Sequence, residues 1–328
     1  MPNNKTKSAN LKKQKKESEH QSEVKQQKII IWAVVGGLAL VFLFSIFLGN
    51  RYRITQKQKK IIEEKNKIVE EKNKDITDSI NYAKRIQEAI LPAKEIKYKL
   101  FPNAFVLFQP RDIVSGDFYW FTEKNGKRII SAVDCTGHGV PGAFMSMIGN
   151  AFLNEIVNQR GITQPSEILS ELRHSIIHSL KQSDKEGGAK DGMDIALLSF
   201  DDENNTVEFS GAHNPLLRCK MADGKWQMEE YLADKRPIGY YLGKGLPFTN
   251  QKISLQKGDT LYIFTDGYAD QFGGPKGKKF KYKQFQEVLL SIQNEPMIKQ
   301  EEILLKKFSE WKGSLEQIDD VLVIGIKV

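Results

Sequence analysis

One uninterrupted apolar segment limits most strongly what this chain can fold into. Residues 29–49 are 21 positions without a charged side chain. As a helix with a rise of about 1.5 Å per residue, such a segment crosses a hydrocarbon core about 30 Å thick. Trp32 near one end, and Arg51, Tyr52 and Arg53 beyond the other, are residue types that anchor a span at the membrane interface. We therefore expect a transmembrane helix over residues 29–49.

A cleaved signal peptide is the alternative interpretation of this segment. A signal peptide needs a shorter apolar core and a small-x-small cleavage site, and Phe47-Leu48-Gly49 does not provide one clearly. The lysines and arginines on the two sides of the segment nearly balance, so the positive-inside rule leaves the orientation open.

The excess positive charge of the chain lies in front of its globular part. The net charge is +8, and residues 1–100 contain 22 Lys and Arg against 11 Asp and Glu, which leaves 27 against 30 for the remainder. Residues 1–28 are polar and Lys-rich, so we expect a disordered basic leader. A basic flank suits anionic lipid headgroups. A slightly acidic globular part argues against a nucleic-acid partner.

A heptad repeat follows the apolar segment. Ile61–Lys67 has the sequence IIEEKNK, and residues 68–74 repeat it as IVEEKNK. Apolar residues at positions 62, 69, 76, 83 and 90 keep one seam facing a partner helix, and Asn66 and Asn73 at the other core position favour two strands. We expect a coiled-coil signalling helix within residues 50–91 that pairs two copies through residues 57–91, and Pro92 ends it. A solitary, charged helix is the alternative.

Beyond Pro92 the pattern changes to short strands mixed with helices. Alternating or short apolar runs predict strands at residues 104–109, 117–123, 128–134, 195–200, 206–211, 216–220, 260–265 and 321–328. Helical periodicity predicts helices at residues 142–160 and 165–182, and one or two more within 283–312. This order predicts an α+β domain over residues 97–328, with two antiparallel sheets covered by helices.

Four acidic residues lie at the ends of predicted strands: Asp117, Asp134, Asp266 and Asp319. A single Asp-Gly pair usually marks a turn, but four strand-end carboxylates predict a shared cleft. Converging carboxylates repel one another and raise one another's pKa unless a cation neutralises them. Ligands that are all oxygen suit Mg²⁺ or Mn²⁺. Two such ions can hold a bridging water, lower its pKa and position a phosphoryl group for in-line attack.

Six motifs in series resemble the PP2C-type (PPM) protein serine/threonine phosphatases, and among them the bacterial branch named for the sporulation phosphatase SpoIIE. In chain order they are Gly116-Asp117-Phe118-Tyr119, Asp134-Cys135-Thr136-Gly137-His138-Gly139, Phe209-Ser210-Gly211-Ala212-His213-Asn214-Pro215, Arg236-Pro237-Ile238-Gly239, Thr265-Asp266-Gly267 and Asp319-Asp320-Val321. The resemblance implies a PP2C-like α-β-β-α sandwich with two Mn²⁺ or Mg²⁺ ions in a cleft between sheet edges.

The resemblance also implies roles for the acidic residues. Asp134 resembles the carboxylate that bridges both metals, and the main-chain carbonyl of Cys135 resembles a further ligand, where many relatives have Gly. Asp117 resembles the ligand that reaches the second metal through water. Asp266 and Asp319 resemble the remaining ligands of the first metal. The implied nucleophile is a metal-bridging hydroxide. A cysteine-phosphatase mechanism at Cys135 is disfavoured, because no Cys-x₅-Arg loop follows it.

Other polar residues near the motifs have two interpretations each. Asp320 is a weaker ligand candidate, because a strand would turn it to the face opposite Asp319. Arg111 is a candidate phosphate-binding residue or a surface arginine. His138 is a candidate general acid, although a structural turn histidine is the favoured interpretation, as is loop stabilisation for His213. Residues 191–194 form either a further metal site or, preferably, a turn.

The leading prediction is hydrolysis of phosphoserine or phosphothreonine on a protein by a membrane-anchored enzyme. The resemblance implies a STAS-domain antagonist of an anti-sigma factor as the substrate class, within a partner-switching pathway. Such a substrate is cytosolic, so we expect a single-pass protein of the cytoplasmic membrane with its catalytic domain in the cytoplasm. The alternative is a phosphatase-like scaffold without catalysis, which loss of a metal-binding carboxylate would indicate; all four are present.

Overall fold

The computed structural model describes residues 3–92, 96, 99–183, 190–241 and 246–328. The expected domain boundary at residue 97 lies outside them. The chain divides into two compact units, Met1–Ile76 and Thr77–Val328.

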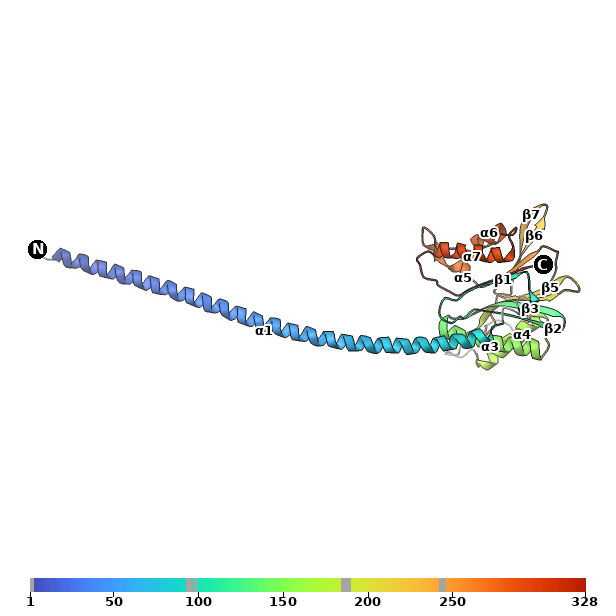
Figure 1. The fold of residues 1–328 in the computed structure, drawn as a ribbon, viewed down its shortest axis with the longest axis horizontal. Helices are drawn as coiled ribbons and strands as arrows, with labels where there is room; N and C mark the ends of the chain where they lie inside the picture. Colours follow the sequence, from blue (N-terminus) through green and yellow to red (C-terminus); the bar gives the residue numbers. More distant parts are fainter. Residues whose placement is uncertain (1–2, 93–95, 97–98, 184–189, 242–245) are drawn as a thin grey trace. The chain divides into compact units, whose positions relative to one another are not determined.

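A single helix, α1 (Asn3–Ile90), forms the described part of the first unit and the beginning of the second (Figure 1). It covers the predicted helix from residue 57 onward and ends just before Pro92. The expectation of a disordered leader differs from the structure, in which residues 3–28 are helical. Between Asn3 and Lys28 there is no Gly or Pro, and Lys, Gln, Glu and Ala are good helix formers, so the helix continues without tertiary contacts.

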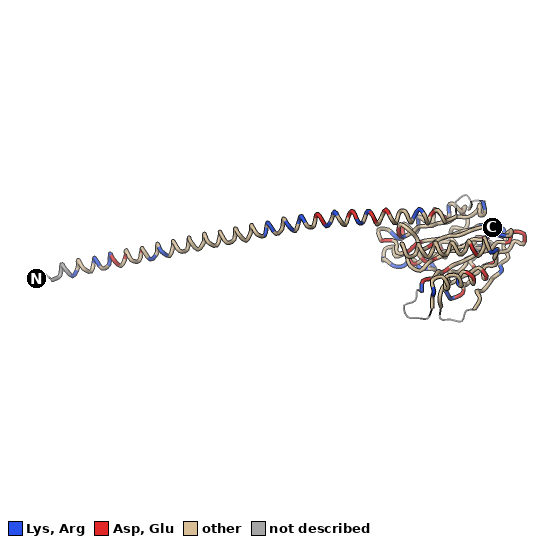
Figure 2. The backbone as a smooth tube through the Cα atoms, turned by 90° about the horizontal axis from the view of Figure 1, so that it is seen from below, with Lys and Arg blue, Asp and Glu red and all other residues tan. Residues whose placement is uncertain are grey.

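The segment at residues 29–49 is an uncharged stretch of α1, and the tube in Figure 2 shows neither basic nor acidic colour there. By length and composition α1 is the one helix among the described residues that can cross a membrane, and a signal sequence near an N-terminus passes the same test. Its apolar side chains are exposed, as at Leu40 with 70% and Trp32 with 72%. This apolar surface therefore has no covering within the described chain.

The second unit contains two five-stranded antiparallel sheets. The first has the order β1 (Ala104–Gln109), β12 (Val321–Lys327), β9 (Thr260–Phe264), β6 (Leu216–Ala222) and β7 (Lys225–Tyr231). The second has the order β2 (Phe118–Lys124), β3 (Lys127–Cys135), β4 (Met193–Asp201), β5 (Thr206–Ala212) and β8 (Gln251–Ser254). A small hairpin, β10 (Phe272–Gly273) and β11 (Lys278–Lys279), stands apart from both sheets.

Helices cover the outer face of each sheet, which gives the four layers visible in Figure 1. On one side lie α3 (Gly139–Leu153), its π-helical continuation η1 (Asn154–Gln159) and α4 (Pro165–Ser179); on the other lie α6 (Tyr282–Ser291) and α7 (Met297–Lys312). A four-residue helix, α5 (Gly267–Asp270), follows β9. Three apolar cores separate the layers: one under α3 and α4, one between the sheets, and one under α6 and α7.

The predicted arrangement of two antiparallel sheets with helices is confirmed, and all eight predicted strands are present with shifts of one or two residues. Sequence patterns missed β7 and β8 at the sheet edges, together with the hairpin. β7 (KWQMEEY) has no buried side chain, and β8 has only four residues. Neither presents the apolar run that marks a core strand.

Candidate active site

Strand ends from both sheets converge on one acidic cavity. Asp134 is the next-to-last residue of β3, Asp266 lies two residues beyond the end of β9, and Asp319 lies two residues before the start of β12. The cavity has a volume of about 220 Å³ and is lined by Asp134, Cys135, Thr136, Gly137, His138, Asp194, Asp266 and Asp319. Three of the four predicted carboxylates thus line one cavity, although Asp266 is more than 130 residues beyond Asp134 in the chain.

Asp117, the fourth predicted carboxylate, is buried beside the others, with 3% of its surface exposed. It precedes β2, and one of its oxygens accepts a hydrogen bond of 2.6 Å from the hydroxyl of Thr265. The same hydroxyl accepts the backbone N–H of Leu322 at 3.1 Å. Thr265 therefore connects the Asp117 carboxylate to β12, a contact that the sequence pattern did not predict.

Asp320 has a different role from its neighbour Asp319. It is 2% exposed, and its two carboxylate oxygens accept the backbone N–H groups of Arg111 and Gly116, each at 2.7 Å. A carboxylate that already accepts strong backbone hydrogen bonds holds the loop before Asp117 in place. This geometry agrees with its lower rank as a metal ligand.

The loop before β2 is packed closely against the turn after β3. A Cβ atom on Gly116 would lie 2.5 Å from the carbonyl oxygen of Gly137 and 3.3 Å from that of Cys135. On its other side the loop is bound by Gln87 of α1, whose side-chain amide donates to the Ser115 carbonyl at 2.6 Å and accepts the Ser115 N–H at 3.1 Å. The amide also donates to the Ser146 hydroxyl of α3 at 2.8 Å. The last turn of α1 thus supports the loop that carries Asp117.

The carboxylates of the cavity destabilise one another's charged forms. Burial, and then repulsion from Asp134, raises the pKa of Asp117 well above its usual range. Burial, and then repulsion from Asp266 and Asp319, does the same to the pKa of Asp134. For Asp266, burial and then Asp319 raise the pKa to about 6, while Lys279 acts in the opposite direction. Burial also raises the pKa of Asp319.

This donor set fits divalent cations, because a buried group of repelling carboxylates is stabilised by positive charge and offers only hard oxygen ligands. In the part of the chain that the structure describes, no three His, Cys, Asp or Glu side chains stand together as a metal cage. Ions held here would therefore also draw on main-chain carbonyls and water, as Mg²⁺ commonly does.

His138 lines the cavity, and the positive charge of Arg111 acts on Asp319, where it opposes the rise of the pKa. His138 precedes α3, and its Nδ1 lies 2.8 Å from the Asp112 carboxylate, which orients the ring. Arg111 donates from Nη1 to the carbonyl of Ile318, one residue before Asp319, at 2.7 Å. Cys135 has a buried thiol whose pKa is raised well above its usual range by burial and then by Asp134, so it is not a thiolate nucleophile.

Asp194 belongs to the segment for which a turn was preferred and a further metal site was the alternative. β4 begins at Met193, and Asp194 pairs with Asp134 across the β3–β4 ladder and lines the cavity. This position differs from a plain turn, and the metal site stays a prediction. His213, expected to stabilise a loop, contacts the Asp194 carboxylate through Nδ1 at 2.9 Å. The available signal was a charged residue within the otherwise apolar run MDIALLSF.

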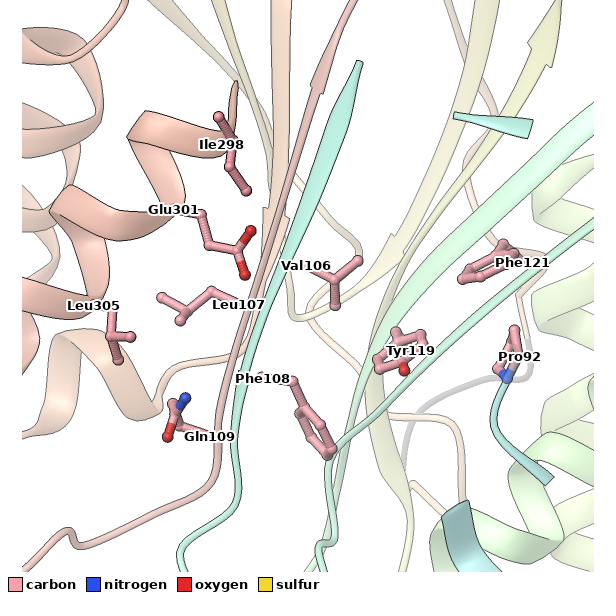
Figure 3. Close-up of a pocket in the computed structure, with 10 residues that line it drawn as sticks. All are labelled: Pro92, Val106, Leu107, Phe108, Gln109, Tyr119, Phe121, Ile298, Glu301 and Leu305. Atoms are coloured by element: carbon pink, nitrogen blue, oxygen red, sulfur yellow. The ribbon is translucent and has the colours of Figure 1, made fainter. Parts of the chain in front are cut away.

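A larger cavity of about 420 Å³ lies beside the edge strands β1 and β2 and is shown in Figure 3. Val106 and Phe108 of β1, Tyr119 of β2 and Ile298 of α7 line it. Glu301 is the one acidic residue in its described lining. It lacks a group of carboxylates, so the chemistry is assigned to the smaller acidic cavity.

A family model described as stage II sporulation protein E (SpoIIE) matches residues 124–328. The PP2C domain of SiaA from Pseudomonas aeruginosa is 32% identical with a TM-score of 0.69, over 78% of this chain and 98% of that one. No curated protein matches the chain.

Two further solved structures share the fold. The PP2C phosphatase domain of SpoIIE from Bacillus subtilis, with a fragment of its regulatory domain, is 19% identical with a TM-score of 0.54, over 69% of this chain and 62% of that one. The RsbU and RsbW domains of Rv1364c from Mycobacterium tuberculosis are 20% identical with a TM-score of 0.52, over 69% and 60%.

Proposed function

Because this chain belongs to the SpoIIE family of PP2C-type serine/threonine phosphatases, we propose that it is a membrane-anchored, metal-dependent enzyme that removes phosphate from phosphoserine or phosphothreonine of a regulatory protein. The observation that carries the proposal is the convergence of Asp134, Asp266 and Asp319 on one cavity, with Asp117 buried beside them. Such a group has no structural benefit that would offset its mutual repulsion.

In this proposal the carboxylates bind metal ions. Asp117, Asp134, Asp266 and Asp319, with the main-chain carbonyl of Cys135, would hold two Mn²⁺ or Mg²⁺ ions. When bound, these ions supply an activated water and neutralise charge on the phosphoryl group.

Two further residues act on the substrate in this proposal. The guanidinium of Arg111, fixed by the Ile318 carbonyl, binds phosphate oxygens through its remaining N–H groups. The ring of His138, held through Nδ1 by Asp112, presents Nε2 as the proton donor for the departing serine or threonine oxygen.

Membrane attachment and pairing are proposed from α1. Its uncharged segment at residues 29–49 has the length of a span, and its exposed apolar side chains would be covered by lipid. Ile62, Val69 and Ile76 recur every seven residues and are each more than half exposed, which fits a partner helix from a second copy. We place the catalytic domain in the cytoplasm, where a phosphorylated regulatory protein is available.

The substrate proposal is a STAS-type antagonist of an anti-sigma factor. Its support is family membership, together with the presence of RsbU and RsbW domains in the Mycobacterium tuberculosis relative. The input signal acts through α1 in this proposal, because its last turn supports the Asp117 loop.

The test is phosphatase activity of the full chain in detergent micelles, with p-nitrophenyl phosphate as substrate. We expect turnover with Mn²⁺, its loss with EDTA, and its loss in Asp134→Asn with the fold intact. Asp223→Asn is the matched control, since Asp223 lies in the exposed β6–β7 turn with a left-handed φ of 50° that Asn adopts readily. Equal activity in Asp134→Asn and Asp223→Asn would remove Asp134 from the site. Absence of turnover under all conditions would favour the scaffold.

A further inference from the structure

A run of lysines follows Asp266 in the chain and has no role in the chemistry described above. Lys276, Lys278, Lys279, Lys281 and Lys283 lie within eight residues, and every one is exposed. No Asp or Glu occurs between Asp270 and Glu287. Residues 101–328 contain more acidic than basic residues, so this run is a local reversal of charge. We call residues 272–281, which include β10 and β11, the lysine hairpin.

The lysine hairpin has a fixed shape set by Trp311 of α7. The backbone N–H of Gly274 donates to the Trp311 carbonyl at 2.7 Å, and the Trp311 ring packs edge-on against Phe280, with centroids 5.2 Å apart. A Cβ atom on Gly274 would lie 2.6 Å from the same ring. A hairpin held this closely presents its lysines in a defined arrangement.

The base of the hairpin is tied to the loops that carry Asp266 and Asp319. Gln271, with no exposed surface, accepts the N–H of Ile318 at 3.2 Å and donates to the Glu316 carbonyl at 2.9 Å. The ammonium of Lys279 lies 2.7 Å from the carboxylate of Asp270 in α5, the helix that directly follows Asp266. The charge of Lys279 also acts on the cavity, because it counteracts the raised pKa of Asp266. The hairpin is therefore anchored next to the segments that carry two of the cavity carboxylates.

The acidic cavity and the lysine hairpin act in opposite ways on an acidic segment of a protein substrate. Asp112, Asp194, Asp266, Asp270 and Asp319 make the surroundings of the cavity acidic, so an approaching acidic segment is repelled. Lysines on a hairpin anchored to the cavity's loops offer such a segment a binding position. Phe272, 40% exposed and 5.9 Å from the Lys279 ammonium, adds an apolar contact.

We propose that the lysine hairpin is a docking surface for acidic residues that flank the phosphorylated serine or threonine of the protein substrate. The proposal rests on the proposed phosphatase function and adds its substrate class. Lys279 is partly engaged by Asp270, so Lys276, Lys278 and Lys281 supply the binding charges. Charges at the edge of a site act mainly on encounter and on dependence on salt.

The experiment compares two synthetic phosphothreonine peptides of one sequence, flanked either by Asp and Glu or by Asn and Gln. Each is hydrolysed by the full chain with Mn²⁺ at low salt. The variant Lys276→Gln, Lys278→Gln, Lys281→Gln removes three charges of the hairpin. Its matched control, Lys252→Gln, Lys257→Gln, Lys307→Gln, removes three exposed lysines elsewhere.

The readout is the ratio of kcat/KM for the acidic peptide to that for the neutral peptide. We expect the hairpin variant to lower this ratio about tenfold through KM, and added salt to lower it in the unchanged chain. The control variant should keep the ratio of the unchanged chain. An equal ratio in all three proteins, or an equal fall in the control, overturns the docking proposal. Failure of all three to hydrolyse p-nitrophenyl phosphate would instead overturn the phosphatase function.

Discussion

Replacing Gln87 with Leu tests the support that α1 gives to the active-site loop. Gln87 is 6% exposed and makes three hydrogen bonds, two to the backbone of Ser115 and one to the hydroxyl of Ser146. Leu fills a similar volume but has no donor or acceptor. The substitution therefore leaves the buried N–H of Ser115 without this partner, while the Ser115 carbonyl keeps only the longer hydrogen bond of 3.3 Å from the Ser146 hydroxyl.

The expected loss follows from these groups. A buried backbone group left without its partner costs about 1–3 kcal/mol, and the extra apolar surface of Leu offsets about 1 kcal/mol. The Ser115 N–H is such a group, and the weakened hydrogen bonding of the Ser115 carbonyl costs about 1 kcal/mol more. We therefore expect the free energy of unfolding of the catalytic unit to fall by about 1–3 kcal/mol. Domains of this kind have about 5–15 kcal/mol in total, so the variant should still fold.

The assay is urea unfolding of the full chain in detergent micelles, followed by fluorescence of the buried Trp120 and the other domain tryptophans. The matched control is Glu88→Gln in the same turn, where Glu88 makes an exposed contact of 3.8 Å with Lys84. Such a pair contributes about 0.3–0.5 kcal/mol. If Gln87→Leu changed the free energy of unfolding no more than Glu88→Gln, the loop would not depend on α1.

Two further predictions concern pH and pairing. In EDTA the pKa of Asp266 is about 6 in the folded chain, against about 3.9 in an unfolded chain. The contribution of protonated Asp266 to the free energy of unfolding is therefore fully present below about pH 4 and is lost as the pH rises through 6. In urea unfolding, the free energy of unfolding of the metal-free chain should therefore fall more steeply between pH 4 and 6 than that of Asp266→Asn. Equal slopes of the two proteins would contradict the raised pKa of Asp266. For pairing, Val69→Cys should form a disulfide-linked dimer under mild oxidation while Glu71→Cys on the outer face should not, since Cys135 and Cys219 are buried; equal crosslinking of the two would favour a solitary helix.

Local sequence patterns predicted much of the fold. Period-two alternation and short apolar runs placed the core strands, because a buried sheet requires apolar side chains on its inner face. A heptad pattern placed the helix that ends at Ile90, because helix formation depends on neighbouring residues. The leader shows that polar composition alone does not predict disorder. A polar segment with good helix formers continues an adjacent helix even without burying apolar surface.

The sequence by itself determined the candidates for the chemistry, since Asp117, Asp134, Asp266 and Asp319 stand out as strand-end carboxylates within ordered motifs. Only the tertiary structure decided how they are supported and what surrounds them. Asp194 enters the cavity through pairing of β3 with β4, and Gln87 reaches Ser115 because the last turns of α1 belong to the same compact unit as the sheets. Such contacts join residues that are far apart in the chain: 28 positions separate Gln87 from Ser115, and 204 separate Asp320 from Gly116. Tertiary packing brings these residues together, and no local sequence pattern predicts it.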